Sequence, residues 1–225
     1  MKIEDKFEDE LSFIFSKEGF NIKKDKAGFI AINKYKLGEK VVFLETIKKT
    51  QTSFAVRIVL WITNEPIQKI HSLVNKRTGS SPVVSFPMSF LAKRLDKVDA
   101  NFERKKFKGT LGDIVSTESI AQYAANLKLC LRTFILPFFD EFNDQESFNT
   151  WLNEPIISGE YKFDIEPIWR DALNSIIVSK LSCSSNFDKL YQKWLEQDLP
   201  KGPKFDTRKE LIQLKEILST DHWVK

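Results

Sequence analysis

The sequence predicts an α+β fold, in which an antiparallel β meander with a packed N-terminal helix is followed by an all-helical C-terminal half. Three observations indicate this fold. An apolar stripe of helical period occupies the first 20 residues. Three runs rich in β-branched and aromatic residues then follow one another through short connections. After about residue 115, strand patterns give way to helical stripes that continue through the rest of the chain.

The N-terminal helix is predicted from apolar residues spaced at i, i+4, i+7 and i+8, which are Phe7, Leu11, Ile14 and Phe15. Gly19 follows, and glycine readily adopts the left-handed conformation that ends many helices. Phe20 stands at the next position, where an apolar side chain packs back onto the helix end. We therefore expect the helix to end just before Gly19.

The β meander is predicted from three runs at residues 29–32, 41–44 and 54–62. Residues 36–39 and 48–53 separate these runs as turns. Connections this short favour antiparallel pairing, because parallel strands need long crossovers. The third run is apolar apart from Arg57, so we expect it to be the central and most buried strand.

A short helix is predicted after Pro66, with one face that holds Ile67, Ile70, His71 and Val74. Residues 78–82 read Thr-Gly-Ser-Ser-Pro, which predicts a loop. Residues 83–91 have a strand-like composition, but Pro87 restricts them to a sheet edge or an irregular extended segment. Residues 92–110 are charged and weakly patterned, and we interpret them as a loop or a ragged hairpin.

The helical half begins with a long stripe made of Ile120, Ala124, Leu127, Leu131, Phe134 and Ile135, and this helix is predicted to end near Pro137. Polar residues then predict the starts of four more helices: Asn143 with Glu146, Asp164 with Pro167, Ser185, and Thr207 with Glu210. Between them lie the apolar faces, which include Trp151, Trp169 and Trp194.

The charge is divided unevenly between the two halves. Residues 1–110 hold 22 Lys and Arg against 13 Asp and Glu, a net of +9, and residues 111–225 hold 13 against 18, a net of −5. The composition therefore shifts near residue 110, from an α+β half at residues 1–110 to a helical half at residues 111–225. We expect the two halves to form one compact unit. A half with a net charge of +9 can attract a polyanion or an acidic protein surface. A solvated lysine face explains the same charges, and we prefer that interpretation.

Most motifs of catalysis are absent from the sequence. There is no GxGxxG, GxxxxGK[ST], GxSxG or HExxH pattern, and only two cysteines and two histidines. Cys130 falls on the apolar side of a predicted helix, so we interpret it as a core residue, and His71 and His222 as structural. The sequence therefore indicates no catalytic, cofactor-binding or metal-binding residue. An enzyme whose site is assembled from scattered residues is still an alternative hypothesis.

Two features suit nucleic acid. Basic residues precede a GXXG pattern at Gly109–Gly112, and such a loop can clamp backbone nucleotides where it joins two helices. Lysines also alternate with Phe29 and Tyr35, as on a sheet that stacks bases. The possible basic binding surface comprises Lys23, Lys24, Lys34, Lys36, Lys105, Lys106 and Lys108.

Residues 5–155 resemble a family of small, uncharacterised bacterial proteins that share a domain of unknown function. The resemblance rests on a helix that runs into Gly19-Phe20, on Lys23-Lys24, on Leu136-Pro137-Phe138-Phe139-Asp140 and on Trp151-Leu152. It implies an N-terminal helix followed by a β meander, and it implies no activity and no catalytic residue.

The function expected from these observations is non-enzymatic binding of another protein in the bacterial cytoplasm, in an immunity-like or regulatory role. No run of about 18 apolar residues is present, and the acidic start is unlike a secretory signal, so we expect neither a membrane nor export. Nucleic-acid binding through the basic half is the alternative, and a motif-less enzyme is a further one.

Overall fold

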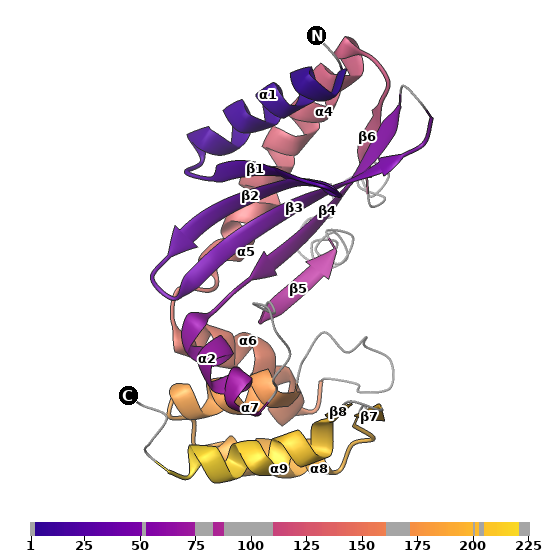
Figure 1. Ribbon diagram of the computed structural model, residues 1–225. Helices are drawn as coiled ribbons and strands as arrows, with labels where there is room; N and C mark the ends of the chain where they lie inside the picture. Colours follow the sequence, from indigo (N-terminus) through magenta and orange to yellow (C-terminus); the bar gives the residue numbers. More distant parts are fainter. Residues whose placement is uncertain are drawn as a thin grey trace. The chain divides into compact units, whose positions relative to one another are not determined.

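The computed structural model describes residues 3–50, 53–74, 83–87, 110–160, 172–199, 201–202 and 205–220, and its fold is α+β, as the sequence predicts (Figure 1). The chain folds as two compact units. The first unit is Met1–Ile62 with Ser85–Glu141, and the second unit is Thr63–Val84 with Phe142–Lys225. The composition shift near residue 110 falls inside the first unit.

The first unit is built on a sheet. Helix α1 (Ile3–Lys17) leads into strands β1 (Asn21–Asp25), β2 (Gly28–Tyr35), β3 (Gly38–Lys48) and β4 (Phe54–Ile62), which pair in that order as an antiparallel meander. Strands β5 (Val84–Pro87) and β6 (Thr110–Ile114) both pair with β4. The predictions of a meander and of a central third run are therefore confirmed. Strand β1 was not predicted.

Helix α1 packs on the sheet through the predicted stripe, whose four residues are all buried. The Phe7 ring lies edge-on to the rings of Phe29 on β2 and Phe54 on β4, with ring centres 5.8 and 5.4 Å apart. The helix ends as predicted. Gly19 has a φ of +78°, and the Phe20 amide donates to the Phe15 carbonyl at 2.9 Å.

A second helical rod covers the same face of the sheet and lies beside α1 (Figure 1). It consists of α4 (Thr117–Cys130), a π-helical turn η2 (Leu131–Ile135) and α5 (Leu136–Asp140). The prediction that the helix ends near Pro137 is wrong. In η2 the Leu136 amide donates to the Leu131 carbonyl, five residues back, and Pro137 then falls in the first turn of α5, where a missing N–H is tolerated.

The GXXG interpretation is not supported by the described residues, because Thr110, Leu111 and Gly112 belong to β6 and pair in a sheet. A clamping loop of this kind joins two helices instead. Gly109 and the lysines before it lie outside the described residues, as do the predicted loop at 78–82 and the helix start at Asp164 and Pro167. The predicted loop or hairpin over 92–110 also lies outside them, apart from Thr110, which belongs to β6.

The second unit is helical around a buried centre. It contains α2 (Glu65–Val74), α6 (Gln145–Ser158), α7 (Ala172–Leu181), α8 (Phe187–Leu195) and α9 (Thr207–Leu218), with a small ribbon of β7 (Lys201–Gly202) and β8 (Phe205–Asp206). Helix α7 contacts α2, α6, α8 and α9. Residues 172–179 of α7 are all buried, so this helix forms the core of the unit.

The helix caps of the second unit fall one residue away from their predicted positions. Asp144, and not Asn143, caps α6 by accepting a hydrogen bond from the Ser147 amide at 2.8 Å. Asp206, and not Thr207, caps α9 through the Lys209 amide, at 3.2 Å. Asn186, and not Ser185, stands at the start of α8. Aspartate is as effective a cap as asparagine, so neighbouring candidates cannot be separated by residue type alone.

Candidate functional site

The described lysines of the predicted basic surface do not all lie on one face of the sheet. Lys23 and Lys24 are neighbours on β1, so their side chains leave opposite faces of the sheet. The Lys24 ammonium donates to Glu8 of α1 at 3.0 Å, and this hydrogen bond raises the lysine pKa. Lys34 lies opposite Glu39 at the other end of β2. Lys36 occupies the turn that follows, and Lys105, Lys106 and Lys108 lie outside the described residues.

The two aromatic residues expected beside these lysines do not form a stacking platform. Phe29 is buried beneath α1. Tyr35 is half-buried, and the Lys40 ammonium lies 5.2 Å from its ring centre. A different pair stacks on the sheet face opposite α1: Phe43 of β3 and Trp61 of β4, with ring centres 5.6 Å apart and planes inclined by 22°. Both are half-buried, and Lys23 shares their face by its register with Ile30 and Phe43.

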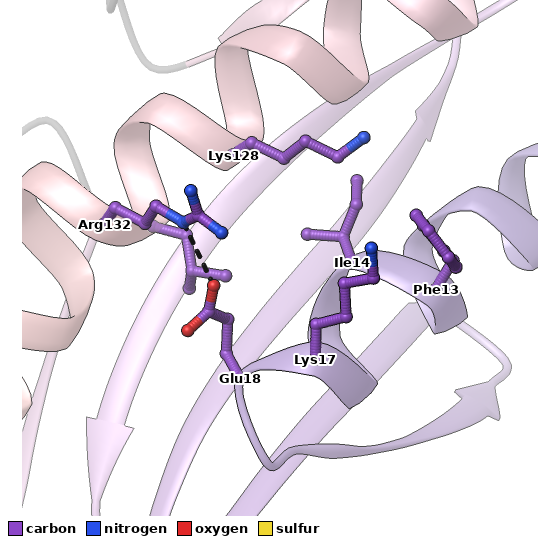
Figure 2. A pocket seen from close by; sticks show the side chains of 7 residues that line it. Phe13, Ile14, Lys17, Glu18, Lys128 and Arg132 are labelled. Carbon is purple, nitrogen blue, oxygen red and sulfur yellow. Dashed lines mark hydrogen bonds and ion pairs between the residues drawn. The ribbon is translucent and has the colours of Figure 1, made fainter.

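A groove between α1 and the α4–η2 rod brings apolar and basic side chains together (Figure 2). It has a volume of about 200 Å³. Its floor is made by Ile14 and Leu131, both buried, because these residues belong to the stripes through which the two helices pack on the sheet. Phe13 lies off the α1 stripe and is 50% exposed at the edge of the groove.

Three cations surround this groove. The Lys17 ammonium lies 4.0 Å from the centre of the Phe13 ring, and the Lys128 ammonium lies 5.7 Å from it. Arg132 lies on the other side and donates from Nε to Glu18 Oε1 at 3.1 Å (Figure 2). These distances place Lys17 and Lys128 within the range of a cation–π interaction.

The cations of the groove are only partly neutralised. Glu18 pairs with Arg132, and Glu10 accepts from Lys128 at 3.1 Å. In the part of the chain that the structure describes, Lys17 has no carboxylate partner. The local charge of the groove is therefore positive, although α1 as a whole is acidic at its start.

Two further observations mark this groove. Arg132 and Leu131 belong to the π-helical turn η2, a distortion that is frequent at functional sites. Leu129, beside Lys128 in the sequence, is 58% exposed, so α4 also carries a large apolar side chain at its surface, although Leu129 does not line the groove.

The groove was not predicted from the sequence. Its α1 residues and its α4–η2 residues are more than 100 positions apart, so no local motif contains them. One signal was present: Phe13 and Leu129 are large apolar residues that lie off the buried stripes of their helices. A pattern of this kind indicates an apolar residue kept at the surface, although it does not say what covers it.

The described residues offer few groups for catalysis. Within residues 3–220, leaving out the gaps named above, no group of three His, Cys, Asp or Glu side chains could hold a metal ion. Cys130 is buried, which confirms its prediction as a core residue, and burial raises the pKa of its thiol to about 12. Its thiolate is therefore disfavoured at neutral pH. His71 is half-buried on α2, and His222 lies outside the described residues.

None of the described helices combines the length and the apolar character needed to cross a membrane. Comparisons of the chain with protein-family models, with curated proteins and with solved structures find no match. The functional argument therefore rests on the groove and on the surfaces of the two units.

Proposed function

We propose that this protein is a non-enzymatic binding protein of the bacterial cytoplasm, immunity-like or regulatory, and that it binds another protein through the α1–α4 groove. The observation that carries the proposal is the half-exposed ring of Phe13, with the Lys17 ammonium 4.0 Å from its centre and Arg132 across the groove. We also propose that residues 5–155 belong to the family of uncharacterised bacterial proteins that they resemble.

The side chains of the groove define the chemistry of the partner. Aromatic residues and arginine are enriched among the residues that dominate protein–protein binding energy. The floor of Ile14 and Leu131 suits an apolar side chain, whereas Lys17 and Arg132 suit carboxylates on either side of it. The expected partner surface is therefore an exposed apolar residue flanked by Asp or Glu. A groove of this size would hold a single anchoring side chain.

The test compares two charge-introducing variants at exposed apolar sites. Phe13→Glu changes the groove, and Ile212→Glu is the matched control, because Ile212 is a 45% exposed apolar residue on α9. Both variants are expected to stay folded, since neither side chain is in the core. Each protein is immobilised and exposed to a bacterial lysate, and any protein retained by the parent is then purified and titrated calorimetrically.

The proposal requires that the purified partner binds the parent and the Ile212→Glu variant alike, and binds Phe13→Glu at least roughly tenfold more weakly. Equal affinity for all three proteins would show that the groove does not take part in partner binding.

Nucleic-acid binding is the second candidate, because the stacked Phe43–Trp61 pair shares its sheet face with Lys23. Aromatic rings on a basic sheet can stack bases without sequence preference. Fluorescence anisotropy with single-stranded and double-stranded oligonucleotides at two salt concentrations tests this candidate. Affinity that falls steeply with salt and is lost in Trp61→Ala would favour it over the groove.

A further inference from the structure

A second and larger cavity lies at one end of the sheet in the first unit. It has a volume of about 710 Å³, and it is lined by the first turn of α1, the β1–β2 hairpin, the end of β3 and the start of β4, with Thr50 and Ser53. Small-molecule sites commonly enclose about 300–1,000 Å³. Nothing in the proposed function uses this cavity, so the inference drawn from it goes beyond that proposal.

Aromatic rings contribute the apolar part of the lining. Phe29 and Phe54 both line the cavity while remaining largely buried. The Phe7 ring contacts both of them edge-on, and the centre of the Tyr123 ring lies 5.3 Å from that of Phe7. This cluster fixes the two lining rings in place, and a rigid aromatic surface favours a flat, unsaturated ring in the ligand.

The wall beside these rings is also fixed. Gly28 has a φ of +152°, and a Cβ atom added there would lie 2.0 Å from the Leu44 carbonyl oxygen. The close approach of β2 to β3 at this point therefore requires glycine. Thr46 then donates to the Ala27 carbonyl from its amide at 2.8 Å and from its hydroxyl at 3.2 Å. The β1–β2 hairpin is thus tied to β3, and the cavity is formed without a ligand.

Two ammonium groups of the lining are available to an anion. Lys24 is held by Glu8, whereas Lys26 and Lys48 have no carboxylate partner among the described residues. Thr50 and Ser53 also line the cavity, and their hydroxyl oxygens lie 2.6 Å apart. Ammonium and hydroxyl groups together are suited to phosphate oxygens, because both donate hydrogen bonds and the ammonium adds charge.

Two carboxylates narrow the class of ligand. Glu4 and Asp25 line the same cavity, and carboxylates accept hydrogen bonds only. Asp25 already accepts a hydrogen bond from the Lys26 amide at 2.6 Å. A simple aromatic anion would offer the two carboxylates no further donor and would be repelled by them. A ligand that combines a flat ring, amino or hydroxyl donors and one anionic group fits the aromatic rings, the carboxylates and the lysines of the lining.

We infer that this cavity is a binding site for a small nucleotide of the nucleoside monophosphate class. In this arrangement the base packs against Phe29 and Phe54, the phosphate is bound by Lys26 and Lys48, and the sugar hydroxyls or base amino groups donate to Glu4 and Asp25. The site lies entirely within the first unit, and it uses none of the residues of the α1–α4 groove.

The experiment is isothermal titration of the full chain with the four common ribonucleoside 5′-monophosphates, with the matching nucleosides and with inorganic phosphate. At least one monophosphate is expected to bind with a dissociation constant below about 1 mM, and roughly tenfold more tightly than its nucleoside or phosphate alone. Absence of heat from all four monophosphates at that concentration would overturn the inference.

A pair of double variants then locates the binding. Lys26→Glu with Lys48→Glu reverses both available charges of the cavity, and it is expected to weaken the monophosphate by about tenfold or more. Lys189→Glu with Lys209→Glu is the matched control, because it reverses two exposed lysines of the second unit that do not line the cavity. Thermal melting of each variant checks that it is folded. Equal weakening by both pairs would show a general charge effect and would also overturn the inference.

Discussion

Trp194 of α8 donates its indole N–H to Ser175 Oγ of α7 at 2.8 Å, and the Ser175 hydroxyl donates in turn to Asn153 Oδ1 of α6 at 2.6 Å. The Asn153 amide then donates to Asn149 Oδ1 and to the Ser175 carbonyl, each at 2.9 Å. All four residues are buried. A single chain of hydrogen bonds therefore links three helices of the second unit and fixes how they are rotated against one another.

Ser175→Ala is expected to destabilise the protein by about 2–4 kcal/mol, because it leaves the Trp194 N–H and an Asn153 oxygen buried without their partner. The matched control is Ser179→Ala, one turn further along the same helix. The Ser179 hydroxyl is equally buried but has no hydrogen-bond partner in the described part of the chain, so its removal is expected to be neutral or stabilising. Denaturant unfolding measures the free energy of unfolding of both variants. Equal losses of stability in the two variants would contradict this prediction.

Tyr123→Phe is expected to raise the free energy of unfolding by about 1 kcal/mol. The Tyr123 hydroxyl is fully buried, and it has no hydrogen-bond partner among the described residues. The ring itself packs against Phe7, so Tyr123→Ala is expected to cost about 3–5 kcal/mol. Chemical unfolding curves measure both changes. A loss of stability in Tyr123→Phe would mean that the hydroxyl has a partner.

Lys40 should make stability depend on pH in the alkaline range. Its side chain is 10% exposed, and burial lowers its pKa, while Asp140 at 3.7 Å partly opposes this shift. Because the folded state holds the lysine proton less tightly than the unfolded state, the cost of burying the charge is present at neutral pH. This cost is relieved as the pH rises from the lowered pKa towards the ordinary value of 10.5.

Lys40→Met is expected to remove this alkaline gain and to be neutral or stabilising at pH 7, since Asp140 is 77% exposed and stays solvated without its partner. Burial also raises the pKa of Tyr35, which costs stability above about pH 10 in the parent and in the variant alike. The quantity to measure is therefore the difference in unfolding free energy between the two proteins from pH 7 to 10. Lys49→Met, at an exposed pair with Asp113, is the control. A difference that is constant with pH would refute the assignment to Lys40.

Asp144→Ala is expected to destabilise the protein by about 1 kcal/mol through loss of the α6 cap, and Asp144→Ser is expected to recover most of that loss. The Ser147 amide lowers the pKa of Asp144, so this contribution is present above pH 3.8 and is lost as the pH falls through the lowered folded value. Unfolding at pH 7 and at pH 3 measures both effects. If Asn143→Ala lowers the unfolding free energy as much as Asp144→Ala does, Asn143 would be the cap of α6, as the sequence predicts.

Gly28→Ala is expected to disrupt the end of the sheet, because its Cβ would overlap the Leu44 carbonyl. Gly159→Ala is the comparison. Gly159 ends α6 with a φ of +82° and has open space around it, so alanine there meets backbone strain alone, of about 1–2 kcal/mol. Thermal melting should show a much larger loss for Gly28→Ala. Similar melting temperatures would mean that β2 can move away from β3.

The sequence predicted those elements that pack against the core through a periodic set of apolar residues. The α1 stripe and the third apolar run were predicted because burial imposes a period on their residues. Strand β1 was not predicted, because Asn21–Asp25 contains only one apolar residue and forms by pairing along the edge of β2. Edge strands need no apolar alternation, so the sequence carries little signal for them.

The candidate sites were harder to predict for a different reason. A run such as Lys23-Lys24 looks like one basic surface, but a strand sends its neighbours to opposite faces. The groove at Phe13 depends on two helices that are distant in the sequence, and the larger cavity depends on three segments that meet only in the folded sheet. Neither arrangement has a period or a motif along the chain.

The π-helical turn η2 also sets how the rod from Thr117 to Asp140 tolerates changes of length. Deleting one residue there would let the rod continue as a regular α-helix, because a π turn holds one more residue than an α turn over about the same rotation. Arg132 and the buried Phe138 and Phe139 would then keep nearly their present directions if the deleted residue lies between them. Deleting one residue within α4 would instead turn everything after it by about 100°, so η2 is the place where this rod can lose a residue and still keep the groove over the core.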